Sequence, residues 1–424
     1  MSSTEVQGVI EAVWRIEAPK IIAVLTRIVG ELELAEDLAQ DALVIALERW
    51  PKTGIPEKPG PWLLATAKHR AIDRLRRDIN LREKYAQIGT ELGDQAAASE
   101  ADFDVSMEEN IYDDLLRLIF TACHPVLSTE ARVALTLRLL GGLTTAEISR
   151  AFLTPEATVA QRIVRAKRTL ADAHIPFEIP SKDERTERLA SVLEVIYLIF
   201  NEGYTASAGE DWVRPALCEE ALRLGRILAE LSPDEAEVHG LTALMEFQAS
   251  RIRARVDPLG KPILLNEQNR ARWDQLLIRR GLSALDAAHK SGGEPGPYLF
   301  QAEIAACHAR ARTPEETDWV RIAVLYGLLG EIMPSPVVEL NRAVAVSMAY
   351  GPSAGLEIVD DLSSERALEH YHLLPGVRGD LLARLGRFDE ARAEFEHAAA
   401  LANNQREREL LEARARAAAS GHRL

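Results

Sequence analysis

The sequence predicts an all-α protein, and three observations support this. It is rich in Ala, Leu, Glu and Arg, which favour helices, and it lacks alternating runs of β-branched residues. Apolar residues recur at three- and four-residue spacing along most of the chain, as they do on one face of a helix. Pro and Gly gather in short clusters between these stretches. With 424 residues, 47% hydrophobic and 27% charged, the chain is long enough for two or three helical domains.

The composition also excludes several functional classes. A net charge of -15 argues against a general nucleic-acid coat protein, although basic residues gathered on particular faces can still bind DNA. Cys123, Cys218 and Cys307 lie far apart without C-x-x-C spacing, so neither a disulfide framework nor a zinc cluster is indicated. The N-terminus does not resemble a signal peptide, and no apolar run has membrane-spanning length. We therefore expect a cytoplasmic protein without metal, cofactor or membrane contact.

Residues 8–50 have helical patterns, and the second half of this stretch has two distinct faces. The predicted buried face of residues 31–50 consists of Leu34, Leu38, Ala42 and Ile45. A second, mostly polar face follows i, i+3, i+4, i+7 spacing and consists of Asp37, Gln40, Asp41 and Val44. Such a face is either a solvated surface or a docking site for a basic partner, and the sequence leaves both readings open.

Basic residues concentrate on the next predicted helix. Pro51 to Pro61 is rich in Pro and Gly and predicts a loop. In the helix from Trp62 to Asp78, the inward residues are Leu64, Ala67, Ala71 and Leu75, and one flank carries Arg70, Arg74 and Arg77. Arginines on this flank can bind DNA phosphates while the loop holds an exposed base. The alternative is a solvated arginine face stabilised by Asp73 and Asp78, with His69 as a surface or capping residue.

A long acidic segment follows. Glu91 to Asp114 contains nine acidic residues and neither Lys nor Arg. Charge repulsion within such a segment opposes compact folding. We expect a flexible linker between two basic-faced domains. The alternative is a segment that imitates nucleic acid inside a basic channel.

Two short helices joined by a turn are predicted between Leu143 and Leu170. Thr144 and Glu147 have the spacing of a capping box, and Thr154 is expected to cap the second helix, with Pro155 at its first position. Its apolar face consists of Val159, Ile163, Ala166 and Leu170, and its other faces carry Glu156, Thr158, Gln161, Arg162, Arg165, Lys167 and Arg168. Gln and Arg can contact base edges while Arg and Lys neutralise phosphates, as in a recognition helix. The alternative is an ordinary amphipathic hairpin.

The rest of the chain predicts paired helices. After a connector that includes Ile175 to Pro180, helical patterns resume at Arg185 and are interrupted at residues 232–235, 255–262, 291–297, 312–316, 333–336 and 350–353. This arrangement favours an α-solenoid. The best match to a tetratricopeptide (TPR) repeat is LGRFDEARAEFEHAAALANN, through Gly386, Phe388, Ala391, Phe395 and Ala398.

A pocket in this extension is conceivable from a few polar and aromatic residues: Glu202, Tyr204, Trp273, Asp274, Asp318 and Trp319. Residues of this kind more often set helix packing through hydrogen bonds. The chain contains no nucleophile elbow, P-loop, dinucleotide fingerprint or H-E-x-x-H motif. We therefore expect no enzymatic activity.

The order of these features resembles the extracytoplasmic-function (ECF) group of bacterial sigma factors. The resemblance is carried by the DLxQD helix at Asp37–Asp41, the W-L-x-x-x-A-x-x-x-A-x-D-x-x-R-R helix at Trp62–Arg77, the acidic linker and the helix-turn-helix that ends R-A-K-R-x-L. It assigns residues 8–78 to region 2, 79–110 to a linker and 111–172 to region 4. Residues 185–424 resemble the TPR-containing extension of its subgroup 42.

The resemblance also implies roles for individual residues. Docking on core RNA polymerase is implied for Asp37, Leu38, Gln40 and Asp41. Reading of the -10 promoter element is implied for residues 51–77, with Trp62, Lys68, His69, Arg70, Arg74 and Arg77 as candidates; His69 stands where the family usually has Asn. Reading of the -35 element is implied for Glu156, Thr158, Gln161, Arg162, Arg165 and Arg168.

The sequence thus predicts a promoter-specificity subunit that binds core RNA polymerase and promoter DNA. We expect the helical extension to contact the sigma domains and to regulate or stabilise them. One rival is an effector-responsive helix-turn-helix regulator that dimerises through its TPR-like part, and another is a scaffold with solvated basic faces. The first rival leaves Asp37–Asp41 and Trp62–Arg77 unexplained. Co-purification with core polymerase, followed by promoter-dependent transcription in vitro, separates all three readings.

Overall fold

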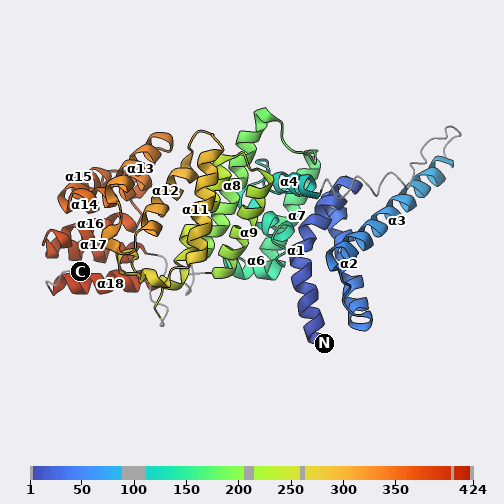
Figure 1. Ribbon diagram of the computed structural model, residues 1–424, viewed down its shortest axis with the longest axis horizontal. Helices are drawn as coiled ribbons and strands as arrows, with labels where there is room; N and C mark the ends of the chain where they lie inside the picture. Colours follow the sequence, from blue (N-terminus) through green and yellow to red (C-terminus); the bar gives the residue numbers. More distant parts are fainter. Residues whose placement is uncertain (1–2, 88–110, 205–213, 258–262, 403–404, 421–424) are drawn as a thin grey trace. The chain divides into compact units, whose positions relative to one another are not determined.

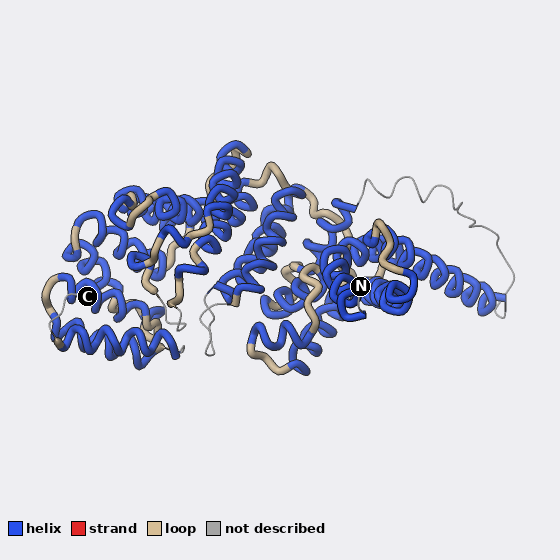
Figure 2. Tube along the Cα trace, turned by 60° about the horizontal axis from the view of Figure 1, so that its bottom comes forward, coloured by secondary structure: helices blue, strands red, loops and turns tan. Residues whose placement is uncertain are grey.

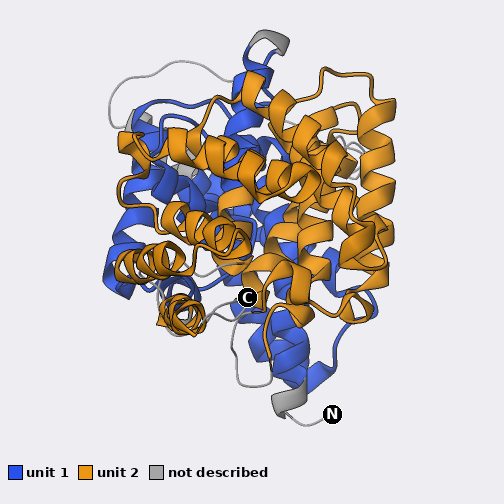
Figure 3. Cartoon of the chain, turned by 90° about the vertical axis from the view of Figure 1, so that its left-hand side faces the viewer, with its two compact units in different colours: residues 1–196 blue, residues 197–424 orange. Residues whose placement is uncertain are grey.

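The computed structural model describes residues 3–87, 111–204, 214–257, 263–402 and 405–420 (Figure 1). Every regular element within these ranges is a helix, and Figure 2 shows them joined by short loops. The prediction of an all-α fold is confirmed. The chain divides into two compact units, Met1–Ile196 and Tyr197–Leu424 (Figure 3). The boundary between them falls inside one helix, α8 (Lys182–Tyr204).

Unit 1 is built around the first helix. Its complete helices are α1 (Ser3–Val29), α2 (Leu32–Thr53), α3 (Pro59–Gln87), α4 (Ile111–Ala122), α5 (Thr129–Leu139), α6 (Thr145–Phe152) and α7 (Glu156–Asp172). α1 packs against α2, α3 and α4, and α7 packs against α5 and α6. Ile21, Ile22 and Leu25 of α1 are buried in this core, because they fall on its inward face. The helices before and after the acidic segment therefore share one core.

The predicted loop from Pro51 to Pro61 is shorter than expected. α2 continues through Pro51 to Thr53, and α3 begins at Pro59, which leaves only residues 54–58 between the helices. Pro51 lies close to the end of α2, and the helix continues only to Thr53 after it, so the ring disturbs few helical residues. Pro59 lies in the first turn of α3, where the missing N–H costs nothing. Prolines at the ends of helices were thus misread as loop residues.

The two-helix stretch from Leu143 to Leu170 forms as predicted, with one difference at the turn. The Thr144 side chain accepts from the Glu147 N–H while the Glu147 carboxylate accepts from the Thr144 N–H, which completes the capping box. Thr154, in contrast, donates to the carbonyl of Phe152 at 3.1 Å and does not cap α7. Pro155 is the N-cap instead, and α7 begins at Glu156. The turn itself passes through Leu153, at a left-handed φ of 48°.

The acidic segment needs a correction at its end. Residues 91–110 lie outside the described ranges, and α4 begins at Ile111. Asp114 is fully buried, and its carboxylate accepts from Arg27 Nε at 2.8 Å and from Arg117 Nη1 at 2.6 Å. Its charge is therefore used inside the unit 1 core and does not extend a linker.

The N-terminal part of α8 is fixed to the helices before it. Arg132 of α5 donates to the Ser191 hydroxyl and, at 3.0 Å, to the Glu194 carboxylate. Ser191 donates to the carbonyl of Cys123 at 2.6 Å, and Arg188 donates to that of Phe120 at 3.0 Å. These bonds satisfy carbonyls at the end of α4 that would otherwise lack partners. Residues 188–194 are therefore part of unit 1.

Unit 2 is a succession of helices that pack on their neighbours in sequence. The remaining α-helices are α9 (Pro215–Leu231), α10 (Ala236–Ser250), α11 (Gln275–Lys290), α12 (Pro297–Arg310), α13 (Trp319–Ile332), α14 (Pro336–Tyr350), α15 (Pro352–Leu362), α16 (Leu373–Arg384), α17 (Phe388–Leu401) and α18 (Gln405–Ala419). Short 3₁₀ helices are η1 (Ile252–Ala254), η2 (Leu265–Glu267), η3 (Arg270–Arg272), η4 (Pro314–Glu316) and η5 (Arg366–Leu368). The break predicted at residues 232–235 lies between α9 and α10. The breaks predicted at 291–297, 333–336 and 350–353 overlap the first residues of α12, α14 and α15, and residues 314–316 of the predicted break at 312–316 form η4. Part of the break at 255–262 lies outside the described residues.

Three hydrophobic clusters follow one another along unit 2. They draw their buried residues from the ranges 243–306, 304–345 and 340–418. Each cluster is thus made by helices close in sequence, as in repeat proteins. In the predicted TPR segment, Ala391, Phe395 and Ala398 of α17 are fully buried and Gly386 takes a left-handed φ of 79° after α16. Assignment of the unit to TPR repeats stays a prediction.

Candidate nucleic-acid interface

The polar face predicted on α2 is exposed. Asp37 and Asp41 lie one turn apart on the surface, and neither carboxylate has a bonding partner among the described residues. The face continues with two exposed apolar side chains, Val44 at 52% and Leu47 at 39% of their full accessible surface. This face is therefore open to solvent and also accessible to a partner protein.

Two other residues assigned to this face have different positions. Leu38 is only 6% exposed and lies with Ala35 and Ala42 on the buried side of α2, so it cannot contact a partner directly. Its spacing from both alanines already placed it there. Gln40 is partly buried and donates to the Glu36 carboxylate at 3.0 Å. The exposed docking candidates are therefore Asp37 and Asp41.

The basic flank of α3 is exposed where the sequence placed it. His69, Arg70, Arg74 and Arg77 are all on the surface, and the three arginines follow i, i+4, i+7 spacing. Leu63, Ala67 and Ala71 form the fully buried side, whereas Leu64, predicted to be inward, is partly exposed. A stripe of three arginines on one side of a helix can follow a nucleic-acid backbone.

Trp62 and Lys68 are less accessible. Both side chains are partly buried. The Trp62 ring packs edge-on against Trp50 with ring centroids 5.3 Å apart. Trp50 is 2% exposed, so Trp62 is anchored to the core by its neighbour.

The helix-turn-helix presents a mixed polar face on α7. Glu156, Gln161, Arg165 and Arg168 are exposed, and Thr158 and Arg162 are partly buried. Arg168 lies 3.5 Å from Asp172, a weak surface ion pair, and Arg165 has no bonding partner among the described residues. The predicted inward residues Val159, Ile163, Ala166 and Leu170 are all buried. α7 is thus held by its apolar side with its polar side accessible.

Lys167 does not belong to the exposed basic face. Its ammonium forms an ion pair with the Glu36 carboxylate of α2, which also accepts from Arg138 Nε of α5 at 2.8 Å. Glu36 is 4% exposed. Burial raises the pKa of Glu36, but the attraction and hydrogen bonds of Lys167 and Arg138 outweigh it, so the pKa lies below its usual range. One buried carboxylate therefore joins α2 to α5 and α7.

Two further ion pairs connect the same parts of unit 1. Arg27 of α1 pairs with Asp114 of α4, as described above. Arg15 of α1 donates to the capping-box residue Glu147 of α6 at 3.1 Å, in a more exposed pair. Residues 3–53 thus make ionic contacts with α4, α5, α6 and α7.

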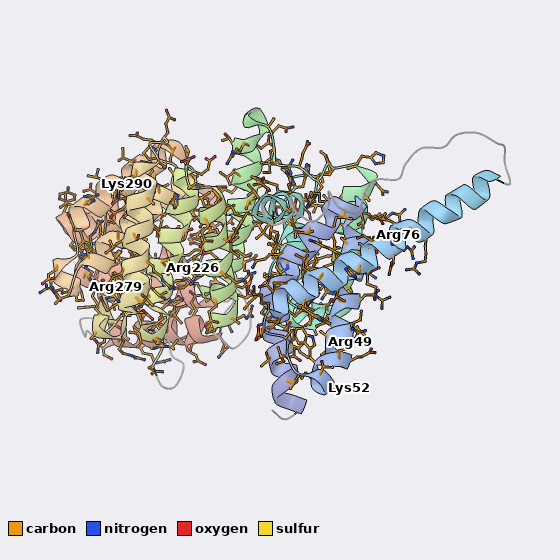
Figure 4. The ribbon with its side chains drawn as sticks, turned by 45° about the vertical axis from the view of Figure 1, so that its right-hand side comes forward. Arg49, Lys52, Arg76, Arg226, Arg279 and Lys290 are labelled. Carbon is orange, nitrogen blue, oxygen red and sulfur yellow. The ribbon has the colours of Figure 1, made fainter. Side chains whose placement is uncertain are left out.

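Sequence reasoning missed these connections and also some exposed cations. Figure 4 labels Arg49 and Lys52 on α2 and Arg76 on α3. All three are exposed, and they extend the basic surface near the predicted -10 residues. Helical spacing alone places Arg49 and Lys52 at the end of α2 and Arg76 on the outer side of α3, so their exposure can be predicted from the sequence. The partners of Glu36 had no such local signal.

The polar residues singled out in unit 2 mostly serve the fold. Asp274 caps α11 by accepting from the N–H groups of Leu276 and Leu277, and Asp318 caps α13 by accepting from that of Arg321. Glu202 forms an ion pair with Arg214. Within the described ranges, no group of three His, Cys, Asp or Glu side chains is placed to hold a metal ion, and no helix is long and apolar enough to span a membrane.

Family comparisons match three parts of the chain. Residues 14–79 match sigma-70 region 2, and residues 117–170 match sigma-70 region 4. Residues 188–289 match a family of unknown function, DUF6596. The exposed surfaces of α2, α3 and α7 all lie within the two sigma-70 matches. No solved structure matches the chain.

Two relatives cover different amounts of the chain. Uncharacterized protein R00370 of Rhizobium meliloti is 45% identical over 390 residues, which is 92% of this chain and 91% of that protein. The probable ECF RNA polymerase sigma factor SigI of Mycobacterium tuberculosis is 24% identical over 176 residues, which is 42% of this chain and 59% of SigI. The first relative extends through both units, whereas the second covers less than half of the chain.

Proposed function

We propose, from the premise that this chain belongs to the same family as R00370 of Rhizobium meliloti and is an ECF-like sigma factor, that it directs promoter-specific transcription in the cytoplasm. In this proposal, α2 docks on core RNA polymerase, α3 reads the -10 element and α7 reads the -35 element. Unit 2 regulates or stabilises the sigma regions in cis. The chain itself carries out no catalysis.

The observation that carries the proposal is the exposed face of α2 within the region 2 match. DNA binding alone requires cations, and α3 and α7 supply them. It does not require an exposed acidic pair beside Val44 and Leu47 on the same small domain. A protein partner with a basic, partly apolar surface accounts for this face. A helix-turn-helix regulator without polymerase contact leaves it unexplained.

The docking test is the double charge reversal Asp37→Arg with Asp41→Arg. Because both side chains are exposed and unpaired, the change should abolish binding to core polymerase while leaving helicity and thermal stability near wild type. The matched control is Glu48→Arg, which reverses an exposed charge farther along α2. Affinity for core polymerase is measured by titration of labelled protein. Unchanged affinity in the double variant removes the basis of the sigma assignment.

Promoter binding requires a rearrangement of unit 1. The -10 and -35 elements are centred about 25 base pairs apart, which is roughly 85 Å on B-DNA at about 3.4 Å per base pair. Glu36 instead holds α2 in direct contact with α7, and α3 packs on α2. Even α3, with its 29 residues, is only about 44 Å long at about 1.5 Å per residue. The described arrangement therefore corresponds to a closed state that must open on a promoter.

Unit 2 is tested by truncation, and the structure decides where to cut. A cut after Pro180 removes Ser191 and Glu194, which leaves Arg132 of α5 without these acceptors. A cut after Ile196 keeps them. We expect the 1–196 chain to change transcription from the cognate promoter strongly, upward if unit 2 inhibits and downward if it supports the active arrangement. The 1–180 chain serves as the comparison for lost region 4 stability.

The readout is single-round transcription with purified core polymerase. Transcription by the 1–196 chain equal to that of the full chain would remove the regulatory role of unit 2. Loss of folding in the 1–180 chain alone, seen by circular dichroism, would show that residues 181–196 serve region 4 and not regulation.

A further inference from the structure

Several arginine and aromatic side chains converge in unit 2, and all of them except His308 lie inside the stretch that matches DUF6596. The cluster consists of Tyr204 at the end of α8, Arg251 after α10, Arg255 after η1, Arg270 and Trp273 at η3, and His308 on α12. The Arg251 guanidinium lies 5.9 Å from the Tyr204 ring centroid and 5.8 Å from that of Trp273. Arg255 lies 3.6 Å from the Tyr204 ring and Arg270 5.1 Å from Trp273. We call this set the arginine cluster.

Arg255 and Arg270 are held in place by hydrogen bonds to other parts of unit 2. Arg255 donates to the carbonyl of Tyr204 at the end of α8. Arg270 is 8% exposed and donates to the carbonyls of His308 and Ala311 and to the Thr317 hydroxyl, at 2.9 to 3.0 Å. These contacts place two fixed positive charges beside the aromatic rings.

Arg251 differs from both. Within the described part of the chain, its guanidinium makes the two ring contacts and no hydrogen bond or ion pair. Its Nε is buried without an acceptor. A cation held between two rings and beside two other cations is costly unless an anion compensates it.

Further donors around Trp273 are also unsatisfied. The indole Nε1 of Trp273, which is 3% exposed, and Nε of Arg270 are both buried without a partner. A bound water, ion or ligand can satisfy such orphaned donors. Glu315 and Glu316 act on Arg270 from η4, but neither pairs with it among the described residues. Arg251 and Arg270 thus lie against the Trp273 indole, and the Nε of each arginine and the indole Nε1 find no acceptor among the described residues.

The His308 side chain of the arginine cluster lies in a buried environment. Its ring packs edge-on against Trp319 at 5.1 Å, and its Nδ1 has no partner. Burial, together with the charges of Arg251 and Arg270, lowers the pKa of His308 to about 3. The imidazole is therefore neutral at pH 7 and adds no further positive charge. The net positive charge of the cluster comes from its arginines.

We infer that the arginine cluster is a binding site for a small anion that carries a carboxylate or phosphate group. Arg251 supplies the free guanidinium, whose planar fork suits either group, and Trp273 and Arg270 supply the buried N–H donors. The site lies wholly within unit 2 and is separate from the polymerase and DNA surfaces of unit 1. It gives this sigma factor a chemical input of its own.

The test is anion binding to the full-length protein. Inorganic phosphate and succinate are titrated separately by calorimetry, with sodium chloride at matched ionic strength as the reference. We expect saturable binding of at least one of the two anions and a rise in Tm that sodium chloride does not reproduce. Which anion binds identifies the group that the site prefers.

Three variants decide the role of Arg251. Arg251→Gln removes the charge and should weaken anion binding by about tenfold or more, and Arg251→Lys should retain part of it. Arg279→Gln is the matched control, because Arg279 is an exposed arginine of α11 (Figure 4). Binding of neither anion, equal stabilisation by sodium chloride, or equal anion affinity in Arg251→Gln and Arg279→Gln would each overturn the inference.

Discussion

The two units use charged residues in different ways. In unit 1, Glu36 is joined to Arg138 and Lys167, which lie 102 and 131 positions along the chain. In unit 2, ion pairs such as Arg378–Asp360, Arg378–Glu394 and Arg321–Glu303 span only 16 to 18 positions. Unit 1 therefore joins remote parts of the chain through ion pairs, which add to the packing of α1 against α4. Unit 2 is held by local contacts, so separating its helices means unfolding them.

The largest effect is expected in the core of unit 2. Phe395→Ala should cost about 3–5 kcal/mol, because the ring is fully buried on α17, packs close to Gly379 and lies under the Arg414 guanidinium at 4.7 Å. Because unit 2 is held by local contacts, this substitution should speed hydrogen exchange in α16–α18 and leave exchange in α2 and α7 unchanged. Urea unfolding and hydrogen exchange measure both effects.

The control for this change is Leu373→Ala, which truncates a side chain that is 41% exposed on α16. It should cost well under half as much as Phe395→Ala. If exchange in α2 and α7 rose as much as in α16–α18 in the Phe395 variant, the distinction between the two units would be wrong.

A smaller effect is expected at the remote contact of unit 1. Glu36→Gln leaves the Lys167 and Arg138 cations without their charged acceptor, at a cost of about 1–3 kcal/mol. Because α2 and α7 are freed while each keeps its core, binding of the free protein to promoter DNA should tighten. Glu48→Gln, on the exposed side of α2, should change neither quantity. Tighter DNA binding in both variants would indicate a general charge effect.

The pH dependence of this contact has a definite sign. The folded pKa of Glu36 lies below its unfolded value of 4.5. Its stabilisation is therefore fully present above the unfolded pKa and is lost as pH falls through the lower, folded pKa. The contact that Glu36 makes between α2 and α7 should therefore not change between pH 6 and 8. A change in DNA binding within that range would come from histidine titration and not from Glu36.

Substitutions on the exposed face of α7 should leave stability nearly unchanged and affect only DNA binding. Changing Gln161 or Arg162 to Ala should cost roughly 1–3 kcal/mol at one base pair of the -35 element, through loss of a base-edge contact. Arg165→Gln or Arg168→Gln should weaken binding to all sequences and lower the salt slope by about one. Binding to a panel of -35 sequences at several salt concentrations separates the two. A uniform loss in all four variants would contradict this division.

Local sequence signals predicted much of the fold. The capping box of Thr144 and Glu147 depends on residues three apart, and it forms as expected. Helix ends were less predictable, because Thr154 has a choice of acceptors within two residues and takes the Phe152 carbonyl. Pro51 and Pro59 are compatible with both a loop and a helix end, and only the packing of α2 and α3 decides between them.

The candidate sites divide in the same way. Exposure of Asp37, Asp41 and the α3 arginines follows from helical spacing, which the sequence displays. The role of Glu36 and the convergence of Arg251 with Trp273 depend on which helices meet, which single-helix periodicity does not contain. Leu38 shows how a motif inherited from a family can combine contact residues with core residues, since only its burial distinguishes them.

The left-handed residue between α6 and α7 limits what the recognition helix tolerates nearby. Leu153 holds φ at 48° although its side chain is 57% exposed, so the turn gains little burial for a conformation that costs an L-residue about 1 kcal/mol or more. Glycine or asparagine at this position would keep the direction of α7 with less strain. A β-branched residue or proline would oppose the turn and change the direction of α7. Variation at position 153 should therefore be restricted by backbone geometry, even though the side chain itself contacts little.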